Sequence, residues 1–287
     1  MKPFYKIIFT ALLFLGSAYS TLSAKETTHT VKSDEASIEY MEEGTGETIV
    51  ILPGGGLSVN YLKPLSNTLS SHGYRVVRIN PRGAGKSSNE KKEVTFKDLT
   101  EDVATVITSL NVGKIVIVGH AYGNRIARML TAIHPELVKG VVLLAAGGKV
   151  APTKEAGMAL KKLFDPKTTD TEYLKAMEFM VGNPKDVEKA GSALKVSRAP
   201  QAGGLQFKAA NTSKIDEWWA PKGKIPYLVI QGSNDQAAPS ENGELLKKDL
   251  GDRVTLVTLK DAGHLVSVTR PQEVSDAMVK FLKKLPR

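Results

Sequence analysis

The feature that most constrains the fold of this 287-residue chain is a series of short, mostly apolar runs, each followed closely by a turn residue. The runs are rich in Val, Ile and Leu and end at or shortly before Gly, Asn or Pro. They occupy residues 48–52, 74–79, 114–118, 141–144 and 227–230. Runs of this length and composition are typical of strands that are buried on both faces of a parallel sheet.

Helix patterns lie between these runs. In residues 96–110 the apolar side chains recur mostly every three or four positions, which places them on one face of a helix. Residues 123–133 and the segment after Pro271 follow as further helices. Strands that alternate with helices predict a doubly wound, mostly parallel α/β sheet. Residues 149–222 interrupt the alternation, and we expect this long stretch to be helical.

The composition fits a globular protein and excludes several kinds of site. Hydrophobic residues make up 41% of the chain and charged residues 24%, which argues against a disordered chain. The sequence has no cysteine, so disulfides, thiolate zinc sites, iron–sulfur clusters and cysteine nucleophiles are excluded. The net charge is +9, but the lysines and arginines are scattered. We therefore expect no nucleic-acid partner.

The first 24 residues are typical of a secretory signal peptide. Lys2 and Lys6 form a positive segment, residues 7–16 are almost wholly apolar, and small residues follow up to Ala24. The apolar run is shorter than the ~20 residues that a transmembrane helix needs. We expect cleavage after Ala24, an exported protein that is periplasmic or secreted, and no membrane span in the mature chain. Cleavage after Ser20 and an uncleaved anchor are the alternatives.

The motif Gly-His-Ala-Tyr-Gly at residues 119–123 organises the functional interpretation. It follows a predicted strand and opens a predicted helix, which is the setting of a nucleophile elbow. Glycines at both ends allow a sharp turn and close packing of the helix on the strand, so the central residue stands exposed above the sheet. That residue is Ala121, where the pattern has serine, and alanine has no nucleophilic atom.

Two further polar residues follow strands of the same predicted sheet. Asp235 comes after the run at 227–230, and His264 comes after a strand predicted at 254–259. The order of elbow, acid and histidine is the one found in α/β-hydrolases. The glycines of Pro-Gly-Gly-Gly at residues 53–56 suit an oxyanion loop, because their backbone N–H groups can point at a developing negative charge.

On these residues the chain is identified as a member of the α/β-hydrolase superfamily, and the resemblance covers nearly all of the mature chain. The segment Asn-Pro-Arg-Gly-Ala-Gly-Lys-Ser at residues 80–87 resembles the superfamily's D-x-R-G-x-G-x-S turn, with asparagine in place of aspartate. The resemblance implies an α/β-hydrolase fold with a core of residues 25–148 and 223–287. Residues 149–222 would form a helical cap inserted into that core.

The resemblance also implies roles for individual residues. Gly55 and Tyr122 would supply the oxyanion-hole N–H groups, and His264 would be paired with Asp235. Ala121 would occupy the nucleophile position and remain inert, so the covalent step of the serine enzymes cannot be carried over. Asp261, three residues before His264, is a rival for the acid, and we rank it below Asp235.

Three hypotheses compete for a site without a nucleophile. In the first, His264 and Asp235 activate water in the space beside Ala121, and the protein hydrolyses a small ester or another activated carbonyl compound. In the second, the chain is a catalytically inactive relative that binds a small ligand. In the third, Ala121 is an engineered replacement of serine in an ordinary serine esterase. We favour the first, an esterase-like hydrolase.

The remaining assignments concern the substrate pocket and partners. His120 and Trp218 are candidates for substrate binding, although His120 also suits a structural hydrogen bond under the elbow and Trp218 suits packing of the cap. The predicted cap has 13 Lys and Arg against 9 Asp and Glu, which favours an anionic small-molecule substrate. No cluster of residues has metal-ligand spacing, so we expect no metal and no organic cofactor. The sequence leaves the oligomeric state open.

Overall fold

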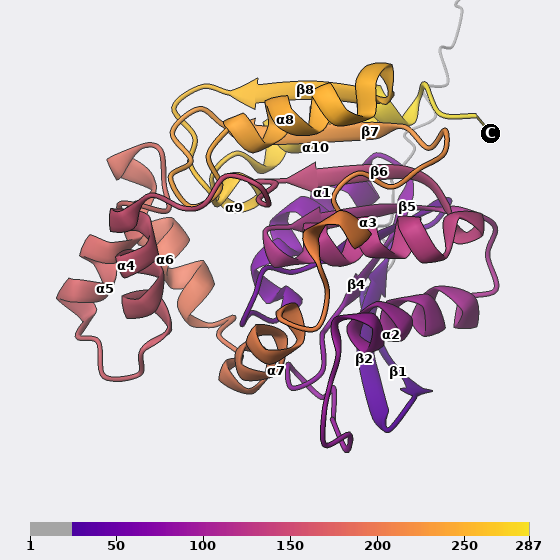
Figure 1. The fold of residues 1–287 in the computed structure, drawn as a ribbon, viewed down its shortest axis with the longest axis horizontal. Helices are drawn as coiled ribbons and strands as arrows, with labels where there is room; N and C mark the ends of the chain where they lie inside the picture. The colour runs from indigo at the N-terminus through magenta and orange to yellow at the C-terminus, as the bar shows by residue number, and fades with distance from the viewer. Residues whose placement is uncertain (1–24, 287) are drawn as a thin grey trace, which may run out of the picture.

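The computed structural model describes residues 25–286, and the predicted signal segment 1–24 lies outside the described residues. The described chain forms one eight-stranded sheet with helices on both faces (Figure 1). The strands are β1 (Thr27–Ser33), β2 (Ala36–Glu43), β3 (Glu47–Leu52), β4 (Tyr74–Ile79), β5 (Ile115–His120), β6 (Val138–Leu144), β7 (Tyr227–Gly232) and β8 (Val254–Leu259).

The strand order is β1-β2-β4-β3-β5-β6-β7-β8. Strands β3 to β8 run parallel to one another, whereas β2 is antiparallel to both β1 and β4. The predicted doubly wound, mostly parallel sheet is therefore confirmed. Because parallel strands present their carboxyl ends at one edge, the loops after β3, β5, β7 and β8 meet there.

Alternate strand residues face two separate hydrophobic layers. Ile49 and Ile51 pack in the layer that contains α1 (Lys63–Ser71) and α10 (Pro271–Leu282). Val50 and Leu52 pack in the opposite layer, with the apolar faces of three other helices. Those helices are α2 (Phe96–Ser109), α3 (Tyr122–Ile133) and α8 (Glu241–Leu250). Burial on both faces explains why the strand sequences lack polar alternation.

A helical insertion separates β6 from β7. Its helices are α4 (Lys154–Phe164), α5 (Asp170–Met177), α6 (Val187–Lys195) and α7 (Pro200–Ala210). In Figure 1 the arrowheads of β6 and β8 point toward α4, α5 and α6, and α7 lies between that group and α2. The shorter helices are η1 (Val59–Leu62), η2 (Pro135–Leu137), η3 (Pro184–Asp186), η4 (Ile215–Glu217), η5 (Gly251–Arg253) and α9 (Val266–Thr269).

Contacts at its two ends join this insertion to the core. The Arg128 guanidinium of α3 lies 4.6 Å from the ring of Trp218 and 4.8 Å from the ring of Trp219. At the core surface, Asp249 accepts hydrogen bonds from the Trp219 indole at 2.6 Å and from Lys149 at 2.7 Å. These contacts therefore fix the two ends of the insertion to the core, near the points where it leaves and rejoins the sheet.

The antiparallel pair β1 and β2 had no counterpart among the expected strands. β1 is largely exposed, and its sequence Thr-Thr-His-Thr-Val-Lys-Ser has a single aliphatic residue, so it lacks the apolar run by which the other strands were found. Backbone hydrogen bonds, rather than burial of side chains, hold β1 beside β2. An edge hairpin of this kind carries little hydrophobic signal in a single sequence.

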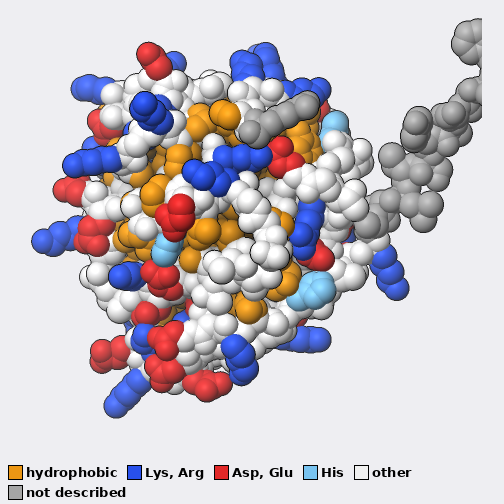
Figure 2. All heavy atoms as spheres, turned by 90° about the vertical axis from the view of Figure 1, so that its right-hand side faces the viewer, with side chains coloured by type: hydrophobic (Ala, Val, Ile, Leu, Met, Phe, Trp, Pro, Cys, Tyr) orange, Lys and Arg blue, Asp and Glu red, His pale blue; other side chains and the backbone are white. Residues whose placement is uncertain are grey.

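The face at the amino ends of the parallel strands carries mixed charge. In Figure 2, Lys and Arg side chains are interspersed with Asp and Glu around a central group of hydrophobic side chains. Among residues 25–286, no helix is both long enough and apolar enough to cross a membrane.

Candidate active site

The elbow at residues 119–123 joins the end of β5 directly to α3. Ala121 has φ +47° and ψ −111°, a backbone conformation that costs energy for any residue with a side chain. A Cβ atom built on Gly119 would lie 2.4 Å from the carbonyl oxygen of Gly123, and one on Gly123 would lie 2.6 Å from the carbonyl oxygen of Pro53. Both glycines are therefore needed for the close approach of α3 to β5 and β3.

His264 and Asp235 lie side by side at the carboxyl edge of the sheet. His264 Nδ1 is 3.0 Å from Asp235 Oδ2 and 3.2 Å from Oδ1. The loops after β7 and β8 pack closely, because Gly232 has no side chain to meet the Ala262 carbonyl. A carboxylate only accepts hydrogen bonds, so Nδ1 carries the proton and Nε2 keeps a free lone pair. That tautomer is the one in which His264 can act as a base.

Asp235 is fixed on its other side by the backbone. Its Oδ1 accepts hydrogen bonds from the N–H groups of Ala237 at 2.9 Å and Ala238 at 2.7 Å, and the side chain is fully buried. Asp261 is exposed instead, and no hydrogen bond joins it to the His264 ring among the described residues. Asp235 is therefore the carboxylate that orients His264.

The loop after β3 leaves one backbone donor free. The Gly54 N–H donates to the Tyr61 hydroxyl at 2.8 Å, and the Gly56 N–H donates to Gln206 Oε1 at 2.7 Å. The Gly55 N–H between them has no hydrogen-bond partner within residues 25–286. Tyr122 is the first residue of α3, and its N–H is one of the donors that a helix leaves unpaired at its start. These two N–H groups are the available donors for an oxyanion.

The elbow, the histidine and the two donors line one cavity. Its volume is about 240 Å³, and most of its walls are apolar. The core contributes Gly54, Gly55, Leu57, His120, Ala121, Tyr122, Arg125, Ala145, Gly147, Ala237, Ala238, His264 and Leu265, and the insertion contributes Pro152, Leu160, Phe164, Met180 and Leu194. A concave, largely apolar pocket with a few converging polar groups is the usual form of a small-molecule site.

A family model described as the alpha/beta hydrolase fold matches residues 47–271 of this sequence. The chain belongs to the α/β-hydrolase fold family. A protein of Haemophilus influenzae, provisionally named an esterase/lipase, is 27% identical over 231 residues, which is 77% of each chain. The (E)-2-((N-methylformamido)methylene)succinate hydrolase of Acinetobacter baylyi is 23% identical, over 88% of this chain and 97% of that protein.

The solved structures agree on the fold. An esterase from Exiguobacterium antarcticum superposes with a TM-score of 0.72 at 20% identity, over 87% of this chain and 96% of that one. Together with the family match, the relatives support the expectation that this α/β-hydrolase fold protein is a hydrolase. Their names concern those proteins, and the roles of Ala121 and His264 remain proposals for this chain.

His120 is a structural residue of this α/β-hydrolase site, although one side of its ring lines the cavity. Its Nε2 lies 2.9 Å from the His264 carbonyl oxygen, so Nε2 must donate; Nδ1 then accepts from the Tyr61 hydroxyl at 2.7 Å. Burial, followed by the neighbouring His264, lowers the pKa of His120 to about 3. The neutral ring therefore joins the oxyanion loop to the histidine loop and has no free nitrogen for a substrate.

Trp218 does not line the cavity. Its ring packs against Phe96, Trp219 and Arg128 at the base of the insertion, and the residue is only 6% exposed. The structure thus places Trp218 in packing at the base of the insertion, which is the alternative role that the sequence had left open for it. A tryptophan pair in a single sequence carries no signal that separates a pocket wall from a packed base.

Arg125 and Phe164 are among the cavity residues that were not found from the sequence. Arg125, on the first turns of α3, and Phe164, at the end of α4, both line the cavity. Arg125 lies on the first turn of the helix that follows the elbow, and this position could have drawn attention to it once the elbow was recognised. Phe164 approaches only through the folding of the insertion. No group of His, Asp and Glu within residues 25–286 has the arrangement of a metal site.

The turn at residues 80–87 is structural. Arg82 forms a buried, bidentate ion pair with Asp102, in which Nε donates to Oδ2 at 2.6 Å and Nη2 donates to Oδ1 at 2.9 Å. The Asn80 carboxamide accepts from the Val59 N–H at 2.9 Å and donates to Glu39 at 2.8 Å. Asparagine in place of aspartate therefore has satisfied partners, and this turn holds the segment that leads into α1.

Proposed function

We propose that this protein hydrolyses a small ester or another activated carbonyl compound by direct attack of water. The observation that carries the proposal is the meeting of three features on one cavity: the oriented His264, the free N–H groups of Gly55 and Tyr122, and the small side chain of Ala121. The substituted succinate in the name of the Acinetobacter baylyi relative supports a substrate of small size.

The steps use only groups of this chain, the substrate and water. His264 Nε2 removes a proton from a water molecule beside Ala121, and the oxygen attacks the carbonyl carbon. The Gly55 and Tyr122 N–H groups stabilise the negative oxygen that develops. Collapse expels the leaving group, which takes its proton from His264, and the products are the acid and the alcohol. Asp235 holds the imidazole in the required tautomer and stabilises its charged form.

The size of the expected catalysis limits the substrate. In serine hydrolases that lose members of the catalytic triad, about 10³- to 10⁴-fold acceleration remains from the oxyanion hole and binding alone. A positioned general base adds about 10²- to 10⁴-fold in favourable cases. These amounts suffice for a reactive carbonyl compound and are small for an ordinary amide. We therefore propose an activated ester or a comparable compound as the substrate class.

We also propose that the protein is exported and acts in the periplasm or outside the cell. The positive segment, the apolar run of residues 7–16 and the small residues up to Ala24 support the proposal. Expression of the full sequence in a bacterial host, followed by intact-mass measurement of the exported protein, tests it. We expect the mass of residues 25–287; an uncleaved chain in the cytoplasm would contradict it.

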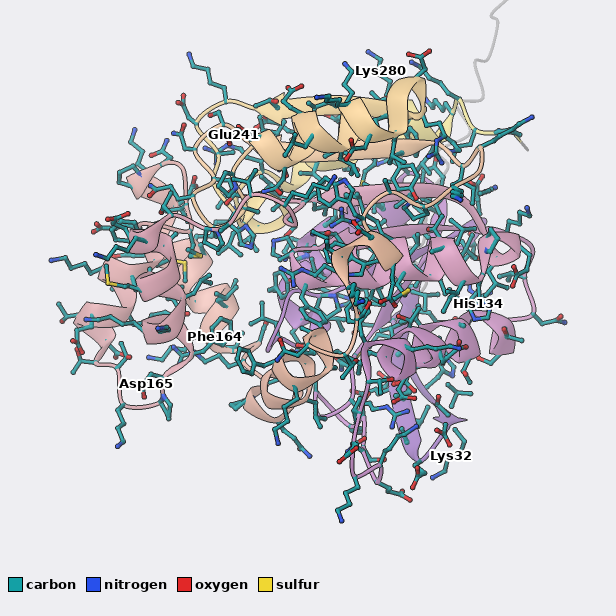
Figure 3. The ribbon with its side chains drawn as sticks, in the orientation of Figure 1. Lys32, His134, Phe164, Asp165, Glu241 and Lys280 are labelled. Atoms are coloured by element: carbon teal, nitrogen blue, oxygen red, sulfur yellow. The ribbon has the colours of Figure 1, made fainter. Side chains whose placement is uncertain are left out.

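The decisive experiment for the activity is hydrolysis of a panel of short activated esters by the wild-type protein and by His264→Ala. His134→Ala is the matched control, because His134 pairs with Glu101 and Glu136 at the far end of α3 (Figure 3). We expect turnover by the wild type and the control, and loss of about 10²-fold or more in His264→Ala. Equal rates in all three would contradict the proposal.

The same panel separates the other hypotheses. A complete lack of turnover in the wild type would favour the ligand-binding relative. A large gain in Ala121→Ser, together with labelling by a serine-reactive phosphonate, would show that the remaining machinery suits a serine esterase. Such a gain would be compatible with either an evolutionary loss or an engineered replacement of the serine.

A further inference from the structure

Arg125 is the one permanently charged side chain among the described residues that line the active-site cavity. It belongs to α3, one turn after the elbow residue Ala121. Side chains of a helix lean toward its amino end, so Arg125 leans toward the elbow. Arg125 and Ala121 line the same cavity, so a positive charge borders the space in which a carbonyl carbon would react.

This arginine has no carboxylate partner in residues 25–286. Its recorded contacts are cation–π contacts, 5.9 Å to the centre of the Tyr122 ring and 5.5 Å to that of Trp218. Burial lowers the pKa of Arg125, and the contribution that opposes this effect comes from Tyr122 rather than from a carboxylate. Arg128, one turn further along, differs because it donates to the carbonyl of Gly147 at 2.7 Å and to the Asn124 side chain. A half-buried cation without a counter-ion is costly unless a ligand supplies one.

Arg125 also lines a second, outer pocket. That pocket lies between α4 and α7, and its walls include Gly203, Gln206 and Phe207 of α7. It shares Gly55, Tyr122, Arg125 and Phe164 with the inner cavity. Figure 3 shows Phe164 on the side of α4 that faces α7. Neither set of lining residues contains Asp or Glu, so the arginine is the charged group at the junction of the two spaces.

We propose that Arg125 binds a carboxylate of the substrate. The protein would then act on an activated carbonyl compound that carries, in addition to the reacting carbonyl group, a negatively charged carboxylate group. The guanidinium presents paired N–H donors that match the two oxygens of a carboxylate. Apolar walls strengthen the attraction because they keep water away. The part of this inference that concerns the reacting carbonyl group of the substrate rests on the proposed function. The part that concerns carboxylate binding rests on the position and partners of Arg125.

The test compares two acetate esters that differ by one charge, 3-acetoxybenzoate and methyl 3-acetoxybenzoate. The meta position prevents the carboxylate from attacking its own ester. Each kcat/KM is divided by the rate of hydroxide-catalysed hydrolysis of the same ester, and the ratio of the charged to the neutral substrate is the readout. We expect the ratio to fall by about 10- to 100-fold in Arg125→Gln, as expected for loss of a hydrogen-bonded charge.

Two further variants make the readout specific. Arg125→Lys keeps the charge and loses the paired donors, so its ratio should lie between those of the wild type and Arg125→Gln. Lys161→Gln removes one exposed charge from α4 without removing a recorded ion pair, and its ratio should equal that of the wild type. A ratio in Arg125→Gln equal to that of the wild type, or an equal fall in Lys161→Gln, would overturn the proposal.

A binding measurement separates failure of this inference from failure of the proposed function. Calorimetric titration with 3-hydroxybenzoate and with its methyl ester needs no turnover. If the wild type hydrolyses neither acetate, the proposed function fails, and the titration alone decides. Tighter binding of the charged compound, lost in Arg125→Gln and kept in Lys161→Gln, supports the carboxylate site. Equal binding of both compounds, no binding of either, or a preference that persists in Arg125→Gln overturns it.

Discussion

The elbow and the histidine loop face the same cavity and differ in whether each supplies a reactive side chain. The elbow keeps its backbone, with the positive φ of Ala121, close contacts at Gly119 and Gly123, and a free N–H at Tyr122, but it has no reactive side chain. The histidine loop keeps its reactive group, with His264 held 3.0 Å from a buried carboxylate oxygen.

The difference teaches that the shape of an elbow and its nucleophile are separable. The shape follows from glycines, from the packing of α3 on β5 and from the backbone hydrogen bonds around them, none of which involves the side chain of residue 121. The free N–H groups of Gly55 and Tyr122 therefore do not depend on a hydroxyl group at residue 121. In the proposed mechanism, a site of this form supplies a base and an anion-stabilising pair of N–H groups and uses water as the nucleophile.

The largest expected effect comes from a substitution in the histidine loop that changes the tautomer of His264. In Asp235→Asn the carboxamide can donate to Nδ1, which moves the ring proton to Nε2 and removes the base. We expect kcat/KM for an activated ester to fall by about 10³-fold, within the range seen for tautomer errors in other histidine sites. Asp261→Asn is the matched control, because Asp261 is an exposed carboxylate three residues before His264. Equal losses in both variants would contradict the assignment of the acid.

A smaller effect comes from breaking the backbone of the elbow. In Gly119→Ala the new Cβ would lie 2.4 Å from the Gly123 carbonyl oxygen and 2.5 Å from Asn124 backbone atoms, so the helix must move. We expect the free energy of unfolding to fall by about 3 kcal/mol. Gly113→Ala is the control, since a Cβ there meets nothing within 4 Å. Denaturant unfolding measures both, and a cost below about 0.5 kcal/mol in Gly119→Ala would refute the packing argument.

The smallest expected effect, per unit of the variable that is changed, concerns the link between the two regions and is measured per pH unit. His120 is neutral in the folded protein because burial lowers its pKa from 6.5 to about 3. Between pH 3 and pH 6.5 the unfolded chain binds a proton at His120 that the folded chain does not bind. The contribution of neutral His120 to the free energy of unfolding is therefore complete above pH 6.5 and is lost as the pH falls toward 3. The expected slope is up to about 1.4 kcal/mol per pH unit.

The measurement for this link is the free energy of unfolding from pH 4 to pH 7, in the wild type and in His120→Asn. The difference between the two curves isolates His120 from the carboxylates that titrate in the same range. We expect the wild-type curve to be steeper toward acid. Parallel curves would contradict a neutral, buried His120 that joins the Tyr61 hydroxyl to the His264 carbonyl.

Residue patterns predicted the central sheet and the order of the site residues, because each depends on local chemistry. Buried strands need unbroken apolar runs, and the elbow needs glycines at Gly119 and Gly123. The positions of Asp235 and His264 followed from the strand ends that carry them. These signals lie within a few residues of the feature that they predict.

The walls of the cavity could not be predicted in the same way. Phe164 reaches the cavity only through the folding of the insertion, and Trp218 packs at its base, although both are aromatic residues of the same segment. Arg125 differs from Arg128 in its partners, not in its sequence context. Such distinctions depend on contacts between segments far apart in the chain, and the exposed β1 strand was missed because it lacks a buried face.

The most direct test of the account is intact-mass measurement of the protein after acid quenching during ester turnover, for the wild type and for Ala121→Ser. Direct attack of water predicts that the wild type hydrolyses the ester while its mass stays unchanged, and that Ala121→Ser gains the mass of the acyl group. A wild-type protein that carries an acyl group during turnover, or that does not turn over the ester at all, would contradict catalysis by His264-activated water.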